Sequence, residues 1–365
     1  MRVFLLKRDT DGSLLEKVKS SSASYRSVDL YGRRAIIAWP DQEVTSIVDD
    51  DVEGIVDRKS YALSSRQFKP EDTAVTVGRI VVGRKRAGHA AATELNPSEA
   101  AAYLKPSDEQ GGVVVAAGPC SVEDEATLHE AAEEVKRAGA QMLRGGAFKP
   151  RTSPYSFTGL GEKGLRMLAR ERELLGMPVV SEVLDVRTLP LFQKANIDML
   201  QVGTRNSQNF PLLEALGDTG KPVLLKRGME NTLEEWLSAA DYVLSRGNGN
   251  VVLCERGIRT FESSTRFALD VGSLAAVKRE SHLPVCADPS HPAGKREFVE
   301  PLALAAVAAG ADMLLIEVHP RPEEALSDPD QQLTPREFRV LMERVRALET
   351  ALRAVEGRLI GSSEA

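Results

Sequence analysis

The period of the hydrophobic pattern changes repeatedly along the chain from Val113 onward. Short runs rich in Val, Leu and Ile alternate with longer stretches in which apolar residues recur every three to four positions. Runs that are apolar on both faces are typical of parallel strands covered by helices, and the longer spacing is typical of amphipathic helices. The strand candidates begin at Val113, Gln141, Pro178, Asp198, Pro222, Asn250, Pro284 and Asp312. Eight βα units in sequence predict an α/β fold, a (β/α)8 TIM barrel.

Two of the longer stretches, 124–138 and 232–245, show the helical spacing most clearly. In the second stretch Asn231 is the expected N-cap, and Thr232 and Glu235 are expected to accept hydrogen bonds in the first turn. Helices of this kind belong to the scaffold of a barrel.

The pattern before residue 67 differs and predicts a small α+β module with a ferredoxin-like order of elements. Its expected elements are a strand at 2–7, a helix at 13–22, strands at 27–30 and 34–39, a short acidic helix at 44–56 and a strand at 60–64. A two-stranded hairpin at 74–77 and 79–82 is expected to cover the bottom of the barrel, and 86–110 is expected to be a lead-in helix. We therefore expect a small domain at 1–66, a linker with hairpin and helix at 67–110, the barrel at 111–355 and a tail at 356–365.

Length and composition agree with this division. The chain has 365 residues, more than the roughly 250 of a typical barrel, so an additional module is expected. A net charge of −6 argues against a nucleic-acid partner. The absence of a long apolar run argues against a signal peptide or membrane helix, so we expect a cytoplasmic protein. Three cysteines in a chain of this length do not suggest a disulfide framework.

Polar residues follow every strand candidate, at the end where the active site of a (β/α)8 barrel lies. These strand-end residues are Cys120, Arg144, Glu182, Arg205, Lys226, Arg256, His291 and Glu317, with Lys149, Pro150, Arg151 and Thr152 in the loop after the second strand. Such a collection at one face predicts a catalytic or binding site.

Three of these residues, Cys120, His291 and Glu317, follow strands one, seven and eight, which are neighbours in a closed barrel. A thiolate, an imidazole and a carboxylate suit Zn²⁺, Fe²⁺ or Mn²⁺, and Asp328 in the next loop offers a fourth ligand. A lone cysteine is more often a buried core thiol, but the coincidence of ligand types favours a metal site. Cys254 and Cys286 lie within strands and are expected in the core.

The basic residues among the strand ends need anionic partners, because a buried unpaired cation is costly. They are Arg144, Lys149, Arg151, Arg205, Lys226 and Arg256. Phosphate and carboxylate groups of substrates would supply those partners. Two alternatives stay open: pairing with Glu182, Glu255 and Asp288 inside the protein, and a Schiff-base role for Lys226.

Several motifs resemble one enzyme family closely. The segments AAGPCS, LRGGAFKPRTSPYSFTGLGEKGL, QVGTRNSQNF, CERGIRTFE, DPSHPAGKR and EVHPRPEEALSD resemble the 3-deoxy-D-arabino-heptulosonate 7-phosphate (DAHP) synthases. The resemblance covers the chain from about Tyr61 to Pro335. It is strongest to the type I beta subgroup, which is related to the 3-deoxy-D-manno-octulosonate 8-phosphate (KDO8P) synthases and includes members with an N-terminal ferredoxin-like regulatory domain.

The resemblance implies condensation of phosphoenolpyruvate with erythrose 4-phosphate, the first step of the shikimate pathway. It implies a divalent metal (Mn²⁺, Fe²⁺, Co²⁺ or Zn²⁺) on Cys120, His291, Glu317 and Asp328. The implied phosphoenolpyruvate site comprises Arg144, Lys149, Glu182, Gly203, Thr204, Arg205, Lys226 and Arg256. The implied erythrose 4-phosphate site comprises Lys149, Pro150, Arg151 and Thr152. Catalytic roles are expected for Lys149, His291 and Glu182, although the general base stays open between Glu182 and a metal-held water.

The resemblance also implies an aromatic effector, tyrosine or phenylalanine, acting through 1–66, and a homo-oligomer, either tetramer or dimer. A module that merely covers the barrel or builds the oligomer is the alternative. The competing enzyme is a KDO8P synthase, which carries an Asn-containing motif where this chain has Lys149-Pro150-Arg151-Thr152. A competing reading of another class is a catalytically silent metabolite-binding regulator.

Overall fold

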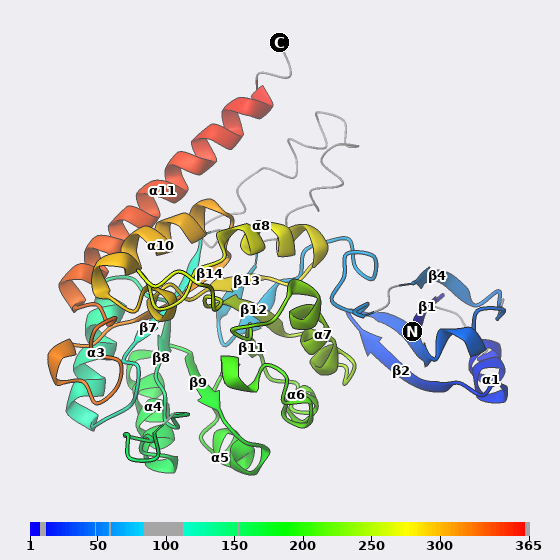
Figure 1. Ribbon diagram of the computed structural model, residues 1–365, viewed down its shortest axis with the longest axis horizontal. Coiled ribbons are helices and arrows are strands. Elements are labelled where there is room, and N and C mark those ends of the chain that lie inside the picture. Colours follow the sequence, from blue (N-terminus) through cyan, green and yellow to red (C-terminus); the bar gives the residue numbers. More distant parts are fainter. Residues whose placement is uncertain (8–11, 48, 58–59, 84–111, 152, 362–365) are drawn as a thin grey trace.

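The molecule is built on a closed parallel barrel (Figure 1). The computed structural model describes residues 1–7, 12–47, 49–57, 60–83, 112–151 and 153–361. The barrel strands are β7 (Val114–Gly118), β8 (Met142–Arg144), β9 (Val179–Val183), β10 (Met199–Val202), β11 (Val223–Lys226), β12 (Val251–Glu255), β13 (Val285–Ala287) and β14 (Met313–Glu317). Neighbours in sequence pair in parallel, and β14 pairs with β7 to close the barrel. The eight predicted strands and the barrel fold are confirmed.

Helices surround the barrel and bury their apolar faces against it. They are α3 (Glu125–Arg137), α4 (Glu162–Leu175), α5 (Leu189–Lys194), α6 (Phe210–Gly217), α7 (Leu233–Leu244), α8 (Val271–Glu280), α9 (Ser290–Ala293), α10 (Arg296–Ala308) and α11 (Pro335–Gly361). The N-cap of α7 is Thr232, not Asn231 as expected, because Thr232 and Glu235 form a reciprocal capping box. Helix α11 continues through 356–361, which we expected to be a tail.

A small hairpin, β5 (Val75–Val77) and β6 (Ile80–Val82), closes the N-terminal end of the barrel. Its residues Val75, Val77 and Val82 belong to one buried cluster with interior residues of the barrel strands. This placement confirms the expected hairpin. Cys254 and Cys286 are fully buried in the same cluster, as predicted for core residues. The helix expected at 86–110 lies outside the described residues.

The N-terminal residues form a separate antiparallel sheet with strand order β2-β3-β1-β4. Its elements are β1 (Arg2–Leu6), α1 (Ser13–Ser20), β2 (Ser24–Leu30), β3 (Arg33–Trp39) and β4 (Val52–Val56). One face of the sheet is covered by α1, whose Leu14 and Val18 pack against Phe4 and Ile36. We refer to this unit as the N-terminal module.

Two expectations for the module are wrong. The acidic helix at 44–56 is instead a short 3-10 helix (Asp41–Glu43), a turn and strand β4. The acidic residues that suggested a helix form the turn, in which Asp49 accepts a hydrogen bond of 2.8 Å from the backbone N–H of Asp51. The strand expected at 60–64 is not one, because the backbone N–H groups of 62–64 donate to the Asp241 carboxylate on α7.

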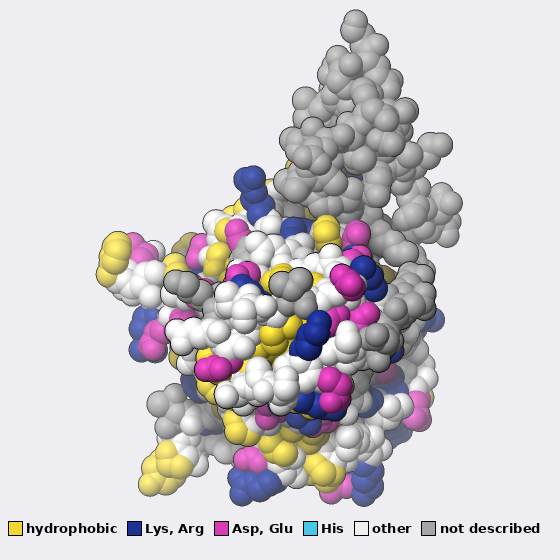
Figure 2. Space-filling model, turned by 90° about the vertical axis from the view of Figure 1, so that its right-hand side faces the viewer, with side chains coloured by type: hydrophobic (Ala, Val, Ile, Leu, Met, Phe, Trp, Pro, Cys, Tyr) yellow, Lys and Arg dark blue, Asp and Glu magenta, His cyan; other side chains and the backbone are white. Residues whose placement is uncertain are grey.

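The module lies beside α7, not over the C-terminal ends of the barrel strands (Figure 1). The Arg26 guanidinium donates to Ser245 Oγ at 2.9 Å, and the Tyr31 hydroxyl donates to the carbonyl of Gly249 at 2.8 Å. Figure 2 shows this end of the molecule, where acidic and basic side chains are interspersed. The hairpin between β2 and β3 therefore anchors the module at the side and N-terminal end of the barrel.

The segment after the module is fastened to the barrel by a buried histidine. The ring of His282 contacts the Leu63 carbonyl through Nε2 and the Thr73 hydroxyl through Nδ1, each at 2.8 Å. A neutral ring satisfies both contacts, with Nε2–H donating and Nδ1 accepting. Burial lowers the pKa of His282 to about 3.

Among the described residues, none of the helices combines the length and the apolarity needed to cross a membrane.

We predict that His282 makes the protein less stable in acid. Its pKa in the folded state is about 3, against 6.5 for an ordinary histidine, so the unfolded chain takes up the proton first. The contribution is complete above pH 6.5 and is lost as the pH falls towards 3, by up to about 1.4 kcal/mol per pH unit. The melting temperatures of the wild type and His282→Gln should therefore converge as the pH is lowered through this interval. A constant difference between them would contradict the prediction.

Candidate active site

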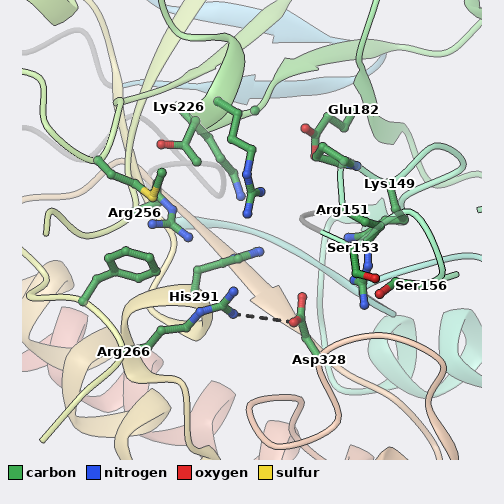
Figure 3. A pocket seen from close by; sticks show the side chains of 16 residues that line it. Lys149, Arg151, Ser153, Ser156, Glu182, Lys226, Arg256, Arg266, His291 and Asp328 are labelled. Carbon is green, nitrogen blue, oxygen red and sulfur yellow. Dashed lines mark ion pairs between the residues drawn. The ribbon is translucent and has the colours of Figure 1, made fainter. Parts of the chain in front are cut away.

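A cavity of about 270 Å³ opens at the C-terminal ends of the barrel strands (Figure 3). Its charged lining is mostly basic. The residues with charged side chains are Lys149, Arg151, Glu182, Arg205, Lys226, Arg256, Arg266 and Asp328, with His291 beside them. Pro150, Gly203 and Thr204 also line the cavity, whereas Thr152 lies outside the described residues. An excess of cations in an enclosed space favours anionic ligands.

A cluster of potential metal ligands lies next to this cavity. Ligand atoms of Cys120, Glu317 and Asp328 all lie within 4.8 Å of one another. Asp328 has a left-handed backbone with φ of 47°, a conformation that aspartate tolerates better than most residues. His291 falls outside this close group, but its Nε2 lies 3.6 Å from Glu317 Oε1. The donor set of thiol, carboxylates and imidazole fits a divalent cation of the transition series.

Cations compensate the buried negative charge of this cluster. Burial opposes ionisation of Glu317, but His291 and Arg144 hold the pKa of its carboxyl well below the usual range. Burial raises the pKa of the Cys120 thiol to about 12. The Lys149 ammonium lies 3.0 Å from Cys120 Sγ, and although burial alone would lower the pKa of Lys149, the attraction of Cys120 and Glu317 raises it. Lys149 therefore connects the cluster of potential metal ligands with the cavity that it lines.

Two of the six predicted cations have carboxylate partners inside the protein. Lys226 lies 2.6 Å from Asp288, which also lies 2.6 Å from His291 Nδ1. Arg144 pairs with Glu317 at 2.9 Å and does not line the cavity. For these residues the alternative of internal pairing applies. Asp288 therefore fixes a candidate metal ligand and a candidate substrate contact at once.

The other arginines face the cavity without a carboxylate partner among the described residues. They are Arg151, Arg205 and Arg256. The guanidinium of Arg256 is almost completely buried against the ring of Phe267, 4.4 Å from its centroid, and burial lowers its pKa. A buried cation that has no carboxylate partner among the described residues needs an anion from a bound ligand to offset the loss of its hydration. These arginines mark the wall where an anionic substrate is expected.

The carboxylate of Glu182 is held at the rim between β9 and β10. Gln201 donates to it at 3.2 Å. A Cβ at position 203 would overlap the Glu182 carboxylate where it now lies. Gly203 therefore lets this carboxylate keep its present position, which any other residue there would shift.

Three residues at this site were missed by the strand-end criterion, namely Arg266, Gln331 and Gln332. Arg266 comes from the loop between β12 and α8, and it lies 3.5 Å from Asp328 (dashed line in Figure 3). The glutamines lie in the loop after β14 and contact Glu317 and Cys120. All three reach the site from the middle of long loops. Loop residues have no periodic hydrophobic pattern, so the sequence does not predict their positions. His319, two residues after the end of β14, is buried with its Nε2 3.6 Å from the Glu123 carboxylate.

The fold and this cavity define a (β/α)8 barrel with a mostly basic cavity beside a cluster of potential metal ligands. The chain matches the DAHP synthetase I family over residues 102–353, and it belongs to that family. A phospho-2-dehydro-3-deoxyheptonate aldolase of Thermotoga maritima is 45% identical over 304 residues, covering 83% of this chain and 82% of the relative.

More distant and structural relatives agree with this placement. A 2-dehydro-3-deoxyphosphooctonate aldolase of Syntrophotalea carbinolica is 32% identical and covers 66% of this chain and 92% of its own. A crystal structure of the DAHP synthase of Thermotoga maritima superposes with a TM-score of 0.72 at 38% identity, covering 96% of this chain and 98% of that one. The structural similarity between this chain and the Thermotoga maritima enzyme therefore includes N-terminal residues as well as the barrel.

Proposed function

We propose that this protein is a metal-dependent DAHP synthase that condenses phosphoenolpyruvate with erythrose 4-phosphate, at the first step of the shikimate pathway to the aromatic amino acids. Its family and its 45% identity to the Thermotoga maritima relative support this activity. The observation that carries the proposal is the basic cavity beside the Cys120 cluster, in which Arg151, Arg205 and Arg256 have no carboxylate partner within the described part of the chain. Two phosphorylated substrates would supply the missing anions.

Each of the two proposed substrates would find oppositely charged side chains in this cavity. Phosphoenolpyruvate carries a phosphate and a carboxylate, which suit Arg205, Lys226 and Arg256 on neighbouring strand ends. The loop that bears Lys149, Pro150 and Arg151 would hold erythrose 4-phosphate, with Arg151 on its phosphate. Arg144 would act through Glu317, since that pair is buried away from the cavity. Held in this way, the two reacting carbons would face each other.

The reaction requires one new carbon–carbon bond and loss of phosphate. C3 of phosphoenolpyruvate attacks the aldehyde carbon, and C2 becomes electron-deficient. Water adds to C2 and loses one proton, which gives a hemiketal phosphate. The remaining hydroxyl proton passes to the departing phosphate as the C2–O bond breaks, so inorganic phosphate is released and the ketone remains. A divalent cation held by Cys120, His291, Glu317 and Asp328 would polarise the aldehyde as a Lewis acid. Lys149 would donate a proton to the developing alkoxide, and Glu182 would accept one from the attacking water.

The competing substrate is a longer aldose phosphate. The 2-dehydro-3-deoxyphosphooctonate aldolase of Syntrophotalea carbinolica is similar to this chain at a lower identity of 32%. The Lys149-Pro150-Arg151 segment lines the cavity where the aldose phosphate would enter. It lacks the Asn-containing motif that is expected in KDO8P synthases. We therefore assign the four-carbon substrate.

We predict phosphoenolpyruvate consumption with erythrose 4-phosphate and little with arabinose 5-phosphate, measured in parallel. Chelation should abolish turnover, and Mn²⁺, Fe²⁺ or Co²⁺ should restore it in the wild type but not in Cys120→Ser. Preference for the five-carbon sugar would reassign the protein as a KDO8P synthase. Full activity in metal-stripped protein would remove the metal from the proposal, and absence of turnover under all conditions would favour a silent regulator.

We predict that Arg151→Ala and Arg205→Ala affect different Michaelis constants. Arg151→Ala should raise that of erythrose 4-phosphate, and Arg205→Ala that of phosphoenolpyruvate, each by roughly 10- to 100-fold for a lost charge-assisted hydrogen bond. Arg187→Ala is the matched control, because Arg187 is exposed and pairs with Asp185. An unchanged constant for erythrose 4-phosphate in Arg151→Ala would refute the placement of that substrate.

We also propose that the N-terminal module is a ferredoxin-like regulatory domain of the type I beta kind, through which tyrosine or phenylalanine inhibits a homo-oligomer. The sheet order β2-β3-β1-β4 supports the ferredoxin-like assignment, with only a 3-10 helix in place of the second helix. The module contacts the C-terminal end of α7, and Met229 in the loop before α7 lines the cavity. Helix α7 thus offers a physical connection between module and site. Inhibition requires the effector to bind two arrangements with different affinity.

The boundary of this domain is best placed before Tyr61. Residues 62–64 donate three backbone hydrogen bonds to Asp241, whose pKa is raised by burial. A deletion up to residue 66, the domain boundary expected from the sequence, would remove the three backbone donors of the Asp241 carboxylate. We therefore assign 61–66 to the barrel.

We predict that deleting residues 1–60 leaves an active barrel that no longer responds to tyrosine or phenylalanine. The measurement is the initial rate with and without each amino acid, for the full chain and the truncated one. A full-length enzyme that ignores both amino acids, or a truncated one that is still inhibited, would refute the regulatory role.

A further inference from the structure

The loop after β14 returns to the strand from which it starts. The backbone N–H of Leu333 donates to the carbonyl of Glu317 at 2.9 Å, and that of His319 donates to the carbonyl of Leu333 at 3.0 Å. This return places the residues just before Leu333, Gln331 and Gln332, among the candidate metal ligands. Both side chains are almost completely buried.

Gln331 holds the carboxylate of Glu317 from one side. Its Nε2 donates to Glu317 Oε2 at 2.6 Å, while Oε1 of the same carboxylate accepts from Arg144 at 2.9 Å. Each carboxylate oxygen therefore has its own donor, and the plane of the group is fixed. The nearest approach of the His291 ring to this carboxylate is at Oε1, which lies 3.6 Å from His291 Nε2.

The other end of the Gln331 amide leads to the next candidate ligand. Its Oε1 accepts a hydrogen bond of 3.2 Å from Arg266, and the same guanidinium lies 3.5 Å from Asp328. A neutral amide can donate to a carboxylate and accept from a guanidinium at once, which a charged side chain of either sign cannot do. The polarity of glutamine is thus matched to both neighbours.

Gln332 performs the equivalent task for the cysteine. Its Oε1 accepts from the backbone N–H of Cys120 at 2.9 Å, and its Nε2 donates to the carbonyl of Ser327 at 2.9 Å. Ser327 directly precedes Asp328, so this amide joins the loop that carries Asp328 to the strand end that carries Cys120. The two adjacent glutamines together reach all three members of the close ligand group.

We propose that Gln331 is a positioning residue for the divalent cation, holding Glu317 so that Oε1 is directed to the metal, with Gln332 holding the Cys120 and Asp328 loops at the matching separation. This inference rests on the metal site of the proposed function. Hydrogen bonds to ligating side chains generally raise metal affinity, and their loss weakens binding by roughly 10- to 100-fold.

The test measures metal binding directly with Co²⁺ as the probe. The dissociation constant comes from competition with a chelator, and the absorption band of a thiolate bound to Co²⁺ reports on Cys120. Gln331→Met keeps the length of the side chain and removes both hydrogen bonds, so its dissociation constant should rise by roughly 10- to 100-fold. Gln331→Asn keeps the amide on a shorter side chain and should also weaken binding, which covers the case of a poorly folded methionine variant.

The matched control is Gln141→Met at the opposite end of the barrel. Gln141 is also hydrogen-bonded, accepting from the backbone N–H of Val115 at 2.8 Å, but it is remote from the ligands. It should bind Co²⁺ like the wild type. Equal affinity in wild type and both Gln331 variants would overturn the inference while leaving the metal site intact. A wild type that shows no thiolate band would overturn both, whereas normal Co²⁺ binding without turnover would count against the proposed function alone.

Discussion

The structure depends on the compensation of buried charge at the C-terminal end of the barrel. Closing the sheet brings the strand ends into a small volume, and the charged groups there lose most of their hydration. The buried negative charge of Asp288 is compensated by its contacts with both Lys226 and His291. That of Glu317 is compensated by Arg144, with a neutral amide on its other oxygen. The site is therefore a linked set of pairs, in which moving one group leaves another uncompensated.

The closure of the barrel also explains which features could be predicted from sequence. Strand runs such as the one before Cys120 are apolar on both faces, so their period identifies them without tertiary information. Polar residues directly after those runs, such as Lys226 and His291, are then confined to one end of the barrel. Their detailed partners did not follow, because pairing within a crowded end depends on side-chain geometry. Arg144 illustrates this, since it neutralises Glu317 and does not reach the cavity.

The errors fall where local pattern and tertiary contact disagree. The segment at 44–56 contains acidic residues that favour a helix start, but an Asx turn at Asp49 uses them and frees Val52 to Val56 for pairing with β1. The segment at 60–64 has the composition of a strand, yet its N–H groups are bound by the Asp241 carboxylate from a distant helix. Gln331 had no signal at all, because its neighbours in space come from loops far away in sequence.

For the arginines that have no carboxylate partner among the described residues, the same desolvation free energy affects both the stability of the fold and the affinity for an anionic ligand. Keeping Arg256 nearly dry against Phe267 opposes folding, because its hydration is lost and no anion within the described chain replaces it. An anionic ligand at this wall would bind only the folded state. Because the arginine is already desolvated there, the ligand would not have to remove its hydration again, and its affinity would be higher. Paired cations such as Lys226 gain less from the same ligand, since Asp288 already compensates them. On the proposed function, a phosphate or carboxylate would therefore bind most strongly at the arginines of the cavity that have no carboxylate partner among the described residues.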